Sequence, residues 1–470
     1  MTDKQLFGTD GIRGLAGEPP LDSSTVFVIG RSLGEYLRER LARPGVLSAP
    51  RVLIAEDTRE SSHWIAETLA AGLREAGAEA ATPGVLTTPG LAHITSAEGF
   101  STGVMISASH NPYQDNGIKV FGANGYKLPD ADEMEVEAKV FAALQDGRPV
   151  QPYRLTMPPR HSLVNHYVAF LRRRAQGIGN SPVRKLVLDC ANGAAAALVR
   201  EVFSGLGLEL SLIADQPDGR NINLNCGSLH LEHLQSAVLR KKADLGVAFD
   251  GDADRALFVD GRGRVVNGDG VLFVASRYLL KRGELRGGVV VGTLMTNQGL
   301  ERALKREGLR LVRTPVGDKY VLEEMLRLGA NLGGEQSGHI IFRDLATTGD
   351  GLLTAVEMLR IIAEQQQPLE QLLEGLEEYP QTIRNIRVRE KIPLEKLPRV
   401  AEQIQASEES LGAAGRIGVR YSGTEPLARV MVEAETEALV EQHAAAIARA
   451  IEQSIGAPAP AGSKEPHLFL

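Results

Sequence analysis

One pattern recurs three times along the chain: RVLIAEDTRESSHWIAETLAAGLREAGAEA at residues 51–80, RKLVLDCANGAAAALVREVFSGLGLEL at 184–210 and GGVVVGTLMTNQGLERALKREGLRLV at 287–312. Each stretch begins with a short β-branched run, continues through turn residues into apolar residues at helical spacing, and ends in a second strand-like run. A glycine stops each helical run, at Gly77, Gly205 and Gly308. This order is typical of a strand–helix–strand crossover, so we predict three similar α/β domains with mixed sheets flanked by helices.

The C-terminal part of the chain has a different composition. A glutamate-rich helical run at 369–380 leads into the strand-like sequences RNIRVRE at 384–390 and GRIGVRYSGTEPLARVMVEAE at 415–435. This change predicts a fourth domain of the α+β class. We place the four domains at residues 1–157, 158–257, 258–375 and 376–457, followed by a flexible tail at 458–470.

Length and composition indicate an ordinary globular protein of several domains. The 470 residues exceed what one hydrophobic core usually serves, and a hydrophobic content of 43% is enough to fold without disulfides. The formal charge of -7 argues against nucleic acid or an anionic membrane as a partner, because both require clustered lysine and arginine. No run of about 18 uncharged apolar residues occurs, so no membrane span is expected. The two cysteines, Cys190 and Cys226, are expected to be reduced, which favours a cytoplasmic location.

The sequence DGDADR brings three carboxylates into one tight turn. An apolar run delivers Asp250, Asp252 and Asp254, and a second apolar run leads away from them. Alternate carboxylates in such a loop can converge on one hard cation, whereas without a cation they would repel one another. An EF-hand is excluded, because Arg255 and Gly261 occupy the positions that require glycine and glutamate. The alternative interpretation is a solvated acidic hairpin turn.

The segment GVMISASHNPYQDNGIKVFGANGYKL, from Gly103, contains a candidate nucleophile. A buried strand is expected to end in small polar residues that expose the hydroxyl of Ser109 beside His110. Serine requires a neighbouring base, a metal or prior phosphorylation to react, and Lys119 follows on a second strand that can reach the same site. An ordinary Asn-Pro turn remains the alternative for this segment taken alone.

Two further loops carry polar groups suited to a phosphorylated sugar. In TPVGDKYVLEEML the candidate anion-binding residues precede a predicted helix, whose N-terminus could bind an anion. The alternative interpretation is that the aspartate only caps this helix. In LGGEQSGHIIF the candidate hydroxyl-binding residues stand among glycines, where simple turn chemistry is the alternative. The candidates are Thr314, Gly317, Asp318 and Lys319 in the first loop, and Glu335, Ser337 and His339 in the second.

The segment VRYSGTEPLARVMVE combines guanidinium groups with hydroxyls and closely spaced backbone amides. This combination fits a phosphate dianion better than a structural turn. The candidate phosphate ligands are Arg420, Ser422, Gly423, Thr424 and Arg429. Near the N-terminus, LFGTDGIRG contains Arg13, which could supply one more cation.

Other classes of enzyme find no support in the sequence. G-x-S-x-G occurs at residues 30–34, but apolar residues keep helical spacing through it, so Ser32 is expected mid-helix rather than on a catalytic turn. No Walker A, H-E-x-x-H or G-x-G-x-x-G sequence is present, which argues against nucleotide and zinc chemistry.

Taken together, SASHNP with DNGIK, DGDADR, GGEQSGH and RYSGTEPLAR resemble, in the same order, the phosphoserine, metal, sugar-recognition and phosphate loops of the α-D-phosphohexomutase superfamily. The resemblance covers essentially the whole chain. Within the superfamily, NINLNCGSLH, GTLMTNQGLE, GGEQSGHIIF and TTGDGLLTA are most similar to the branch that acts on glucosamine phosphates. The resemblance implies three related α/β domains and a fourth α+β domain around a central cleft.

Carried over residue by residue, the resemblance implies a phosphorylated Ser109 as the active form. With Ser109, the three aspartates would complete a site for one Mg²⁺, and Lys119 and Arg255 would handle protons. His110 and Arg13 would support the serine loop. Glu335 and Ser337 would hold sugar hydroxyls, and the Arg420–Arg429 loop would hold the non-reacting phosphate. If cations surround Lys119, its pKa should be lowered, which would allow it to accept a proton near neutral pH.

The activity implied by the resemblance is interconversion of glucosamine 6-phosphate and glucosamine 1-phosphate through a 1,6-bisphosphate. This reaction would feed UDP-N-acetylglucosamine and cell-wall precursor synthesis. Three alternatives stay open: a phosphomannomutase or phosphoglucomutase of the same superfamily, an enzyme with Asp250 or Asp252 as an aspartyl nucleophile, and a silent sugar-phosphate sensor. The expected partner is a small hexosamine phosphate, and the sequence leaves the oligomeric state open, a homodimer being one option.

Overall fold

The computed structural model describes residues 4–41, 49–146, 150–422 and 426–457. Its contacts divide the chain into two compact units. The first contains residues 1–296 and 307–374, and the second contains residues 297–306 and 375–470.

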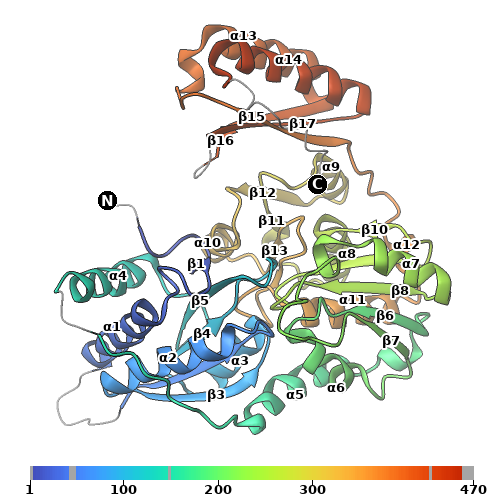
Figure 1. Ribbon diagram of the computed structural model, residues 1–470. Coiled ribbons are helices and arrows are strands. Elements are labelled where there is room, and N and C mark those ends of the chain that lie inside the picture. Colours follow the sequence, from blue (N-terminus) through green and yellow to red (C-terminus); the bar gives the residue numbers. More distant parts are fainter. Residues whose placement is uncertain (1–3, 42–48, 147–149, 423–425, 458–470) are drawn as a thin grey trace. The chain divides into compact units, whose positions relative to one another are not determined.

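The first sheet of the first unit has five strands in the order β1-β5-β4-β2-β3 (Figure 1). Strand β2 runs parallel to both of its neighbours, β3 and β4. Strand β5 runs antiparallel to its neighbours, β4 and β1. The strands are β1 (Ile12–Leu15), β2 (Arg51–Glu56), β3 (Glu79–Val85), β4 (Thr102–Ile106) and β5 (Asp115–Gly122). The polar residues that follow β2 and β4 therefore lie at the same edge of the sheet.

Helices cover both faces of this sheet. One face packs against apolar residues of α1 (Ser23–Leu41), α2 (Ser62–Glu75) and α4 (Asp130–Gln145). The other face meets α3 (Thr88–Ala97), where a Cβ on Gly103 would lie 2.3 Å from Thr95 Oγ1. Ser32 is buried within α1, which confirms that the hydrolase-like pattern is part of a helix.

The second sheet has the order β10-β9-β8-β6-β7. Its core is formed by Val187, Ala248 and Val259 of the strands with Leu234 and Val238 of α7. The elements are α5 (Val164–Arg174), β6 (Lys185–Asp189), α6 (Val199–Phe203), β7 (Glu209–Ile213), α7 (Glu232–Lys241), β8 (Leu245–Phe249), β9 (Ala256–Asp260) and β10 (Val265–Val266). The turn between the antiparallel strands β8 and β9 contains the three aspartates.

The third sheet has the order β12-β11-β13-β14. Val289 and Val291 of β11 pack against Val321 and Met325 of α10. The elements are α8 (Gly268–Lys281), β11 (Val289–Thr293), β12 (Arg310–Thr314), α10 (Asp318–Leu328), β13 (Leu332–Gly334), β14 (Ile340–Phe342), α11 (Gly351–Gln365) and α12 (Leu369–Leu372). Both candidate sugar loops belong to this sheet, one after β12 and the other between β13 and β14.

The second unit contains a three-stranded antiparallel sheet in the order β15-β17-β16. Apolar residues of α13 and α14 cover one face of it, among them Val400, Ala444 and Ile447 (Figure 1). The elements are α9 (Gln298–Arg306), β15 (Gln381–Arg387), α13 (Pro398–Leu411), β16 (Gly415–Tyr421), β17 (Leu427–Ala434) and α14 (Glu437–Ile455). This unit confirms the predicted α+β domain.

The three predicted repeats are confirmed as β2-α2-β3, β6-α6-β7 and β11-α9-β12, each with a parallel strand pair. The glycines that stop the helical runs have positive φ angles, 80° at Gly77, 75° at Gly205 and 74° at Gly308. In the second repeat the helical run is interrupted, with a 3₁₀ turn at Ala194–Ala197 before the short α6. There a Cβ on Gly193 would lie 2.3 Å from Gly251 O, so packing against the aspartate turn fixes the start of this segment.

One predicted domain boundary needs correction. The boundary between residues 257 and 258 falls inside β9, whose backbone hydrogen bonds pair it with β8 and β10. We therefore propose that the second domain ends after β10. The predicted tail at 458–470 lies outside the described residues. None of the helices in the described ranges is long and apolar enough to cross a membrane.

Candidate active site

Residues 107–112, here called the serine loop, follow β4 and place Ser109 in a buried position. Ser109 has a φ angle of 53°, which is uncommon for a residue with a side chain. Its hydroxyl donates to Asp250 Oδ2 at 2.6 Å and lies 3.3 Å from His110 Nδ1. Its backbone N–H donates to Ser107 Oγ at 2.9 Å. The hydroxyl is therefore aimed out of its own domain toward the aspartates.

A buried arginine holds the backbone of the serine loop. Arg59 donates to the carbonyl oxygens of Ser109 and Asn111, both at 2.9 Å, and to that of Asp115 at 3.0 Å. It also pairs with Asp57 at 2.9 Å, and both side chains of this ion pair are 0% exposed. Because a buried guanidinium must satisfy its donors, Arg59 fixes the loop in the conformation that Ser109 requires.

The second domain adds a further clamp on the same carbonyls. Asn223 donates to Ser109 O at 2.9 Å and to Asn111 O at 3.0 Å. The aspartate turn also approaches closely, because a Cβ on Gly251 would lie 2.4 Å from Ser109 O. Glycine is therefore required at the second position of DGDADR to bring the two loops into contact.

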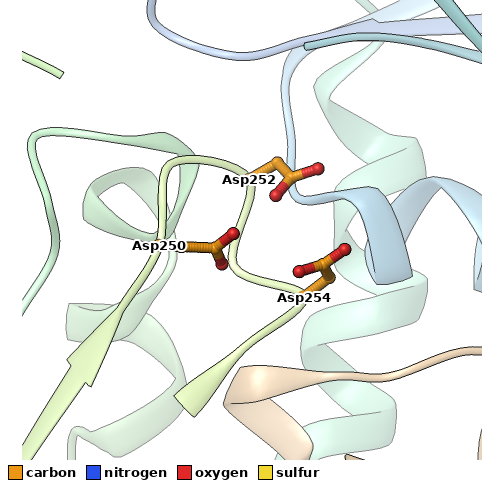
Figure 2. Close-up of side chains that lie close together, drawn as sticks. All are labelled: Asp250, Asp252 and Asp254. Atoms are coloured by element: carbon orange, nitrogen blue, oxygen red, sulfur yellow. The ribbon is translucent and has the colours of Figure 1, made fainter. Parts of the chain in front are cut away.

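Residues 250–255, here called the aspartate loop, bring three buried carboxylates together (Figure 2). One oxygen of each of Asp250, Asp252 and Asp254 lies within 4.8 Å of the others. Among the described residues, Asp252 Oδ1 and Asp254 Oδ1 are buried without a hydrogen-bond partner. Burial, and then the charges of Asp254 and Asp252, raise the pKa of Asp250 well above its ordinary value. Buried carboxylate oxygens without hydrogen bonds, beside an aspartate whose charge is disfavoured, are suited to binding a cation.

This group fits a magnesium ion. Mg²⁺ prefers hard oxygen ligands and is commonly held by a few carboxylates together with phosphate oxygens. Asp252 Oδ1 and Asp254 Oδ1, which have no hydrogen-bond partner in the described part of the chain, would be ligands for such a cation. Ser109 Oγ, 2.6 Å from Asp250, places a fourth oxygen at the same point.

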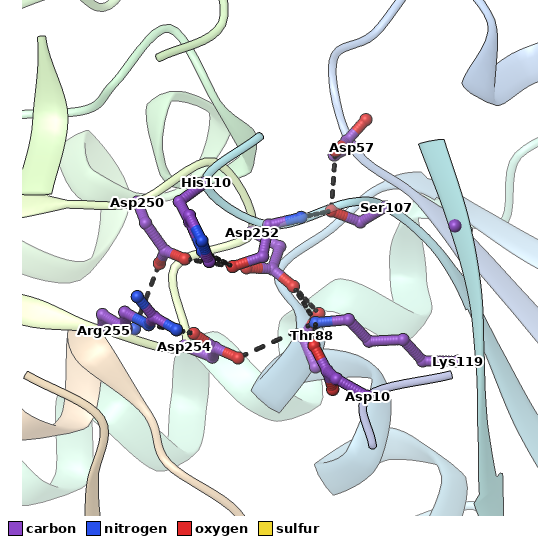
Figure 3. Close-up of polar contacts among 12 residues, drawn as sticks. Asp10, Asp57, Thr88, Ser107, His110, Lys119, Asp250, Asp252, Asp254 and Arg255 are labelled. Carbon is purple, nitrogen blue, oxygen red and sulfur yellow. Dashed lines mark hydrogen bonds and ion pairs between the residues drawn. The ribbon is translucent and has the colours of Figure 1, made fainter. Parts of the chain in front are cut away.

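Lys119, on β5, lies among carboxylates rather than among cations (Figure 3). Its Nζ donates to Asp252 Oδ2 at 2.8 Å and lies 3.1 Å from Asp10 Oδ2 and 3.8 Å from Asp254 Oδ2. Burial by itself lowers the pKa of Lys119, but Asp10, Asp252 and Asp254 outweigh it and raise that pKa above its ordinary value. The expectation of a lowered pKa is therefore wrong for the metal-free protein, because three acidic neighbours come from distant parts of the sequence.

His110, Arg255 and Arg13 are three basic residues that contact the serine loop, the aspartate loop or Asp10. Burial, followed by the charges of Arg255 and Arg13, lowers the pKa of His110 to about 4, so the imidazole is neutral near pH 7. The backbone N–H of Arg255 donates to Asp250 Oδ1 at 3.1 Å, and its Nε lies 3.8 Å from Asp254 Oδ1. Arg13 donates to the side chain of Asn111 at 3.3 Å and forms an ion pair with Asp10.

The second sugar loop, between β13 and β14, reaches the aspartates through one histidine. His339 is buried, with Nδ1 3.6 Å from Asp254 Oδ2 and Nε2 accepting from the backbone N–H of Gly349 at 3.0 Å. Glu335 accepts from the backbone N–H of Gly317 at 3.0 Å, and Ser337 donates to Glu335 at 3.4 Å. The two candidate sugar loops are thus hydrogen-bonded to each other.

The first candidate sugar loop, which follows β12, forms ion pairs with the first domain. Asp318 pairs with Lys127 of the segment after β5, and Lys319 pairs with Asp130 at the start of α4. Asp318 does not cap its helix, since the capping position is Gly317 without a side-chain bond. Thr314 donates within its own domain, to the carbonyl of Gly292 at 3.2 Å.

The candidate phosphate loop belongs to the second unit. Arg420 on β16 stands directly opposite Arg429 on β17, so the strand pairing brings these two arginines to one cross-strand position. Ser422 is buried, and its carbonyl accepts from Lys391 at 2.7 Å, which brings a further cation to this loop. Gly423 and Thr424 lie outside the described residues.

Several residues of the site escaped the sequence interpretation. Asp57 and Arg59 follow β2 at the same sheet edge as the serine loop. Their position directly after a predicted strand could have identified them as site residues. Thr88, which donates to Asp252 Oδ2 at 2.6 Å, offered no local signal. Asn223 offered none either, because its partner Ser109 is remote in sequence, and the same is true of the contact between Asp10 and Lys119.

Family models match almost all of the chain. The phosphoglucomutase/phosphomannomutase models match as domain I at residues 4–146, domain II at 165–263, domain III at 267–379 and the C-terminal domain at 384–450.

Similar curated proteins carry one name. The chain is 53% identical over 459 residues to the phosphoglucosamine mutase of Koribacter versatilis, a match covering 96% of this chain and 98% of that protein. It is 51% identical to the phosphoglucosamine mutase of Solibacter usitatus, covering 96% and 99% respectively.

Solved structures share the fold. A phosphoglucomutase/phosphomannomutase family protein from Burkholderia thailandensis matches with a TM-score of 0.76 at 24% identity, covering 96% of this chain and 97% of that one. The Aspergillus fumigatus N-acetylphosphoglucosamine mutase, solved in complex with GlcNAc-6P and magnesium, matches with a TM-score of 0.65 at 19% identity, covering 96% of each chain.

Proposed function

Because the chain belongs to the phosphoglucosamine mutases of the phosphoglucomutase/phosphomannomutase family, we propose that it interconverts glucosamine 6-phosphate and glucosamine 1-phosphate through a phosphorylated Ser109 and a 1,6-bisphosphate. One observation carries this proposal: a buried serine hydroxyl lies 2.6 Å from a carboxylate of a three-aspartate group. A nucleophilic oxygen beside a divalent-cation site is the arrangement that phosphoryl transfer requires.

The role proposed for each part follows from its contacts. Bound at the aspartates, Mg²⁺ would neutralise charge on the transferring phosphoryl oxygens. Arg59 and Asn223 hold the serine loop, so that the Ser109 oxygen keeps one direction of attack. Arg255, anchored to Asp250 by its backbone N–H, directs a second positive charge toward the same point.

Lys119 enters the proposed reaction as an ammonium group. Its three carboxylate neighbours favour the protonated form, so it would begin by stabilising phosphoryl charge and by donating a proton to a departing oxygen. The neutral imidazole of His110, 3.3 Å from Ser109 Oγ, is the nearest uncharged base. We expect Lys119→Met to abolish transfer while sugar-phosphate binding stays measurable, and near-normal turnover would reject this role.

The remaining site residues stay our predictions for substrate binding. Glu335, Ser337 and His339 would bind sugar hydroxyls, with Gly317 and Asp318 beside them. The residues predicted to bind phosphate are Thr314, Lys319, Arg420, Ser422, Gly423, Thr424 and Arg429. The cross-strand position of Arg420 and Arg429 supports this prediction, because two guanidinium groups together suit a phosphate dianion.

We further propose that the enzyme acts in the cytoplasm with one Mg²⁺ per chain. Glucosamine 1-phosphate made there would feed UDP-N-acetylglucosamine and cell-wall precursor synthesis. A phosphomannomutase or phosphoglucomutase would use the same aspartates and the same serine, so the choice of sugar is tested separately.

The first experiment compares turnover of glucosamine, glucose and mannose 6-phosphates, followed by phosphorus NMR. The proposal predicts the highest kcat/KM with glucosamine 6-phosphate, because a site that pairs an amino group discriminates against analogues that lack it. A higher kcat/KM for glucose or mannose 6-phosphate would instead support the alternative, a phosphoglucomutase or phosphomannomutase.

The second experiment tests the nucleophile. Intact-mass measurement of the purified chain should find one phosphoryl group, located at Ser109 by peptide mapping. Ser109→Ala should lose that group and at least about 10³-fold in kcat, as expected when a nucleophile is removed. Full activity of Ser109→Ala would point to an aspartyl nucleophile, and full binding without turnover in the unchanged chain would point to a sensor.

A further inference from the structure

Lys119 contacts two kinds of carboxylate: proposed metal ligands and one aspartate, Asp10, that is not a proposed metal ligand. On one side its Nζ contacts Asp252 Oδ2 at 2.8 Å and lies 3.8 Å from Asp254 Oδ2, both oxygens of the proposed metal ligands. On the other side it lies 3.1 Å from Asp10 Oδ2. Figure 3 shows Asp10 beside Lys119, on a segment that precedes β1 and is separate from the aspartate loop.

This position creates a conflict when a cation binds. A divalent ion and an ammonium group cannot both use the same carboxylates without strong mutual repulsion, which a buried, poorly screened site enhances. Lys119 itself is only 2% exposed, so water cannot take over its charge. The ammonium therefore needs a carboxylate that is not a metal ligand.

Asp10 is held in place to provide that carboxylate. It precedes β1, and Gly11 presses the chain onto β5, where a Cβ would lie 2.5 Å from Ile118 O and 3.2 Å from the Cα of Lys119. Its other oxygen pairs with Lys127, which also pairs with Asp318 of the third domain. Arg13 also forms an ion pair with Asp10, at the oxygen that approaches Lys119. These contacts hold the Asp10 carboxylate beside Lys119.

We propose that Asp10 is a positioning residue that takes the Lys119 ammonium away from Asp252 and Asp254 and thereby sets the affinity of the aspartate loop for Mg²⁺. The inference rests on the metal site of the proposed function. It adds a role for a residue that contacts neither the metal ligands nor the serine.

The test measures Mg²⁺ binding to the full-length, metal-stripped chain by isothermal titration calorimetry. Asp10→Asn keeps the size of the side chain and removes its charge, and it should weaken Mg²⁺ binding by about tenfold or more, in the range seen for residues that support metal ligands. Asp10→Ser is a second variant with the same expectation. Asp132→Asn is the matched control, because it removes one charge from the same domain at a surface pair with Arg40, and its binding should stay within about twofold of the unchanged chain.

A double variant separates the role of Asp10 from a general loss of negative charge. If Asp10 acts by drawing off Lys119, then adding Asp10→Asn to Lys119→Met should change Mg²⁺ affinity by less than about twofold. A tenfold loss in that background, or wild-type affinity in Asp10→Asn alone, would overturn the inference.

Failure of the metal site itself gives a different result. Asp250→Asn should abolish the binding isotherm if the aspartates hold the ion. If Asp250→Asn binds Mg²⁺ as the unchanged chain does, the metal site of the proposed function is wrong, and the role of Asp10 is rejected with it. If Asp250→Asn loses binding and Asp10→Asn does not, the metal site stands and only the role of Asp10 is rejected.

Discussion

The serine loop and the aspartate loop touch each other, yet they differ in how completely the protein satisfies them. In the serine loop, the carbonyl oxygens of Ser109 and Asn111 each accept hydrogen bonds from both Arg59 and Asn223. In the aspartate loop, Asp252 and Asp254 each keep one buried oxygen without a hydrogen-bond partner among the described residues.

This difference separates a loop whose polar groups the chain satisfies by itself from a loop for which we propose a bound ion. Removing a partner of the serine loop should leave buried polar groups unsatisfied, which is expensive. Removing a charge from the aspartate loop should relieve repulsion when no metal is present. Stability measurements on the metal-free protein can therefore test the comparison directly.

The largest effect is expected for Arg59→Met. This change breaks the hydrogen bonds to the serine loop and leaves Asp57 as a buried, unpaired charge, so the free energy of unfolding should fall by about 3–5 kcal/mol. Urea denaturation measures this loss. Arg200→Met is the control, because its ion pair with Asp215 has an arginine side chain that is 74% exposed, and it should cost less than about 1 kcal/mol. Equal costs for the two variants would contradict a special role for Arg59.

A smaller loss is expected for Gly251→Ala, at the contact between the two loops. The added Cβ would meet Ser109 O at 2.4 Å, so the loops must separate, at a cost of about 1–3 kcal/mol. Transfer should also slow, because the aspartates move away from the nucleophile. The control is Gly179→Ala, whose nearest neighbour would lie at 3.6 Å, and a matching loss there would remove the steric explanation.

Asn223→Ala tests the clamp that comes from the second domain. Two hydrogen bonds to the serine loop are lost, but Arg59 still donates to both carbonyls. We therefore expect the free energy of unfolding to fall by about 1–2 kcal/mol in the same denaturation assay. A loss of unfolding free energy as large as that of Arg59→Met would contradict the expectation that Arg59 stabilises the serine loop more than Asn223 does.

The smallest effect is expected for Asp250→Asn in the metal-free protein. Burial and the two neighbouring aspartates already disfavour the charge of Asp250, so its loss should change the unfolding free energy by less than about 1 kcal/mol. Added Mg²⁺ should then raise the thermal midpoint of the unchanged chain and leave this variant unaffected. A loss of several kcal/mol without metal would mean that the aspartate loop is as self-sufficient as the serine loop.

The sequence by itself determined the strand–helix–strand units and the position of each polar loop at a strand end. Both depend on local periodicity and on turn residues, which are read from a few neighbouring positions. It also identified Ser109 and the aspartates of DGDADR, because their chemistry is concentrated in short segments.

Only the tertiary structure decided how those loops are completed. Arg59 and Asn223 reach the serine loop across 50 and 114 positions, and no local pattern predicts such partners. The same reason explains the error on Lys119: its pKa depends on Asp10 and Asp252, and the separation from Asp252 is 133 positions. Charge interactions act through space, so the direction of a pKa shift is fixed by folding rather than by sequence neighbours.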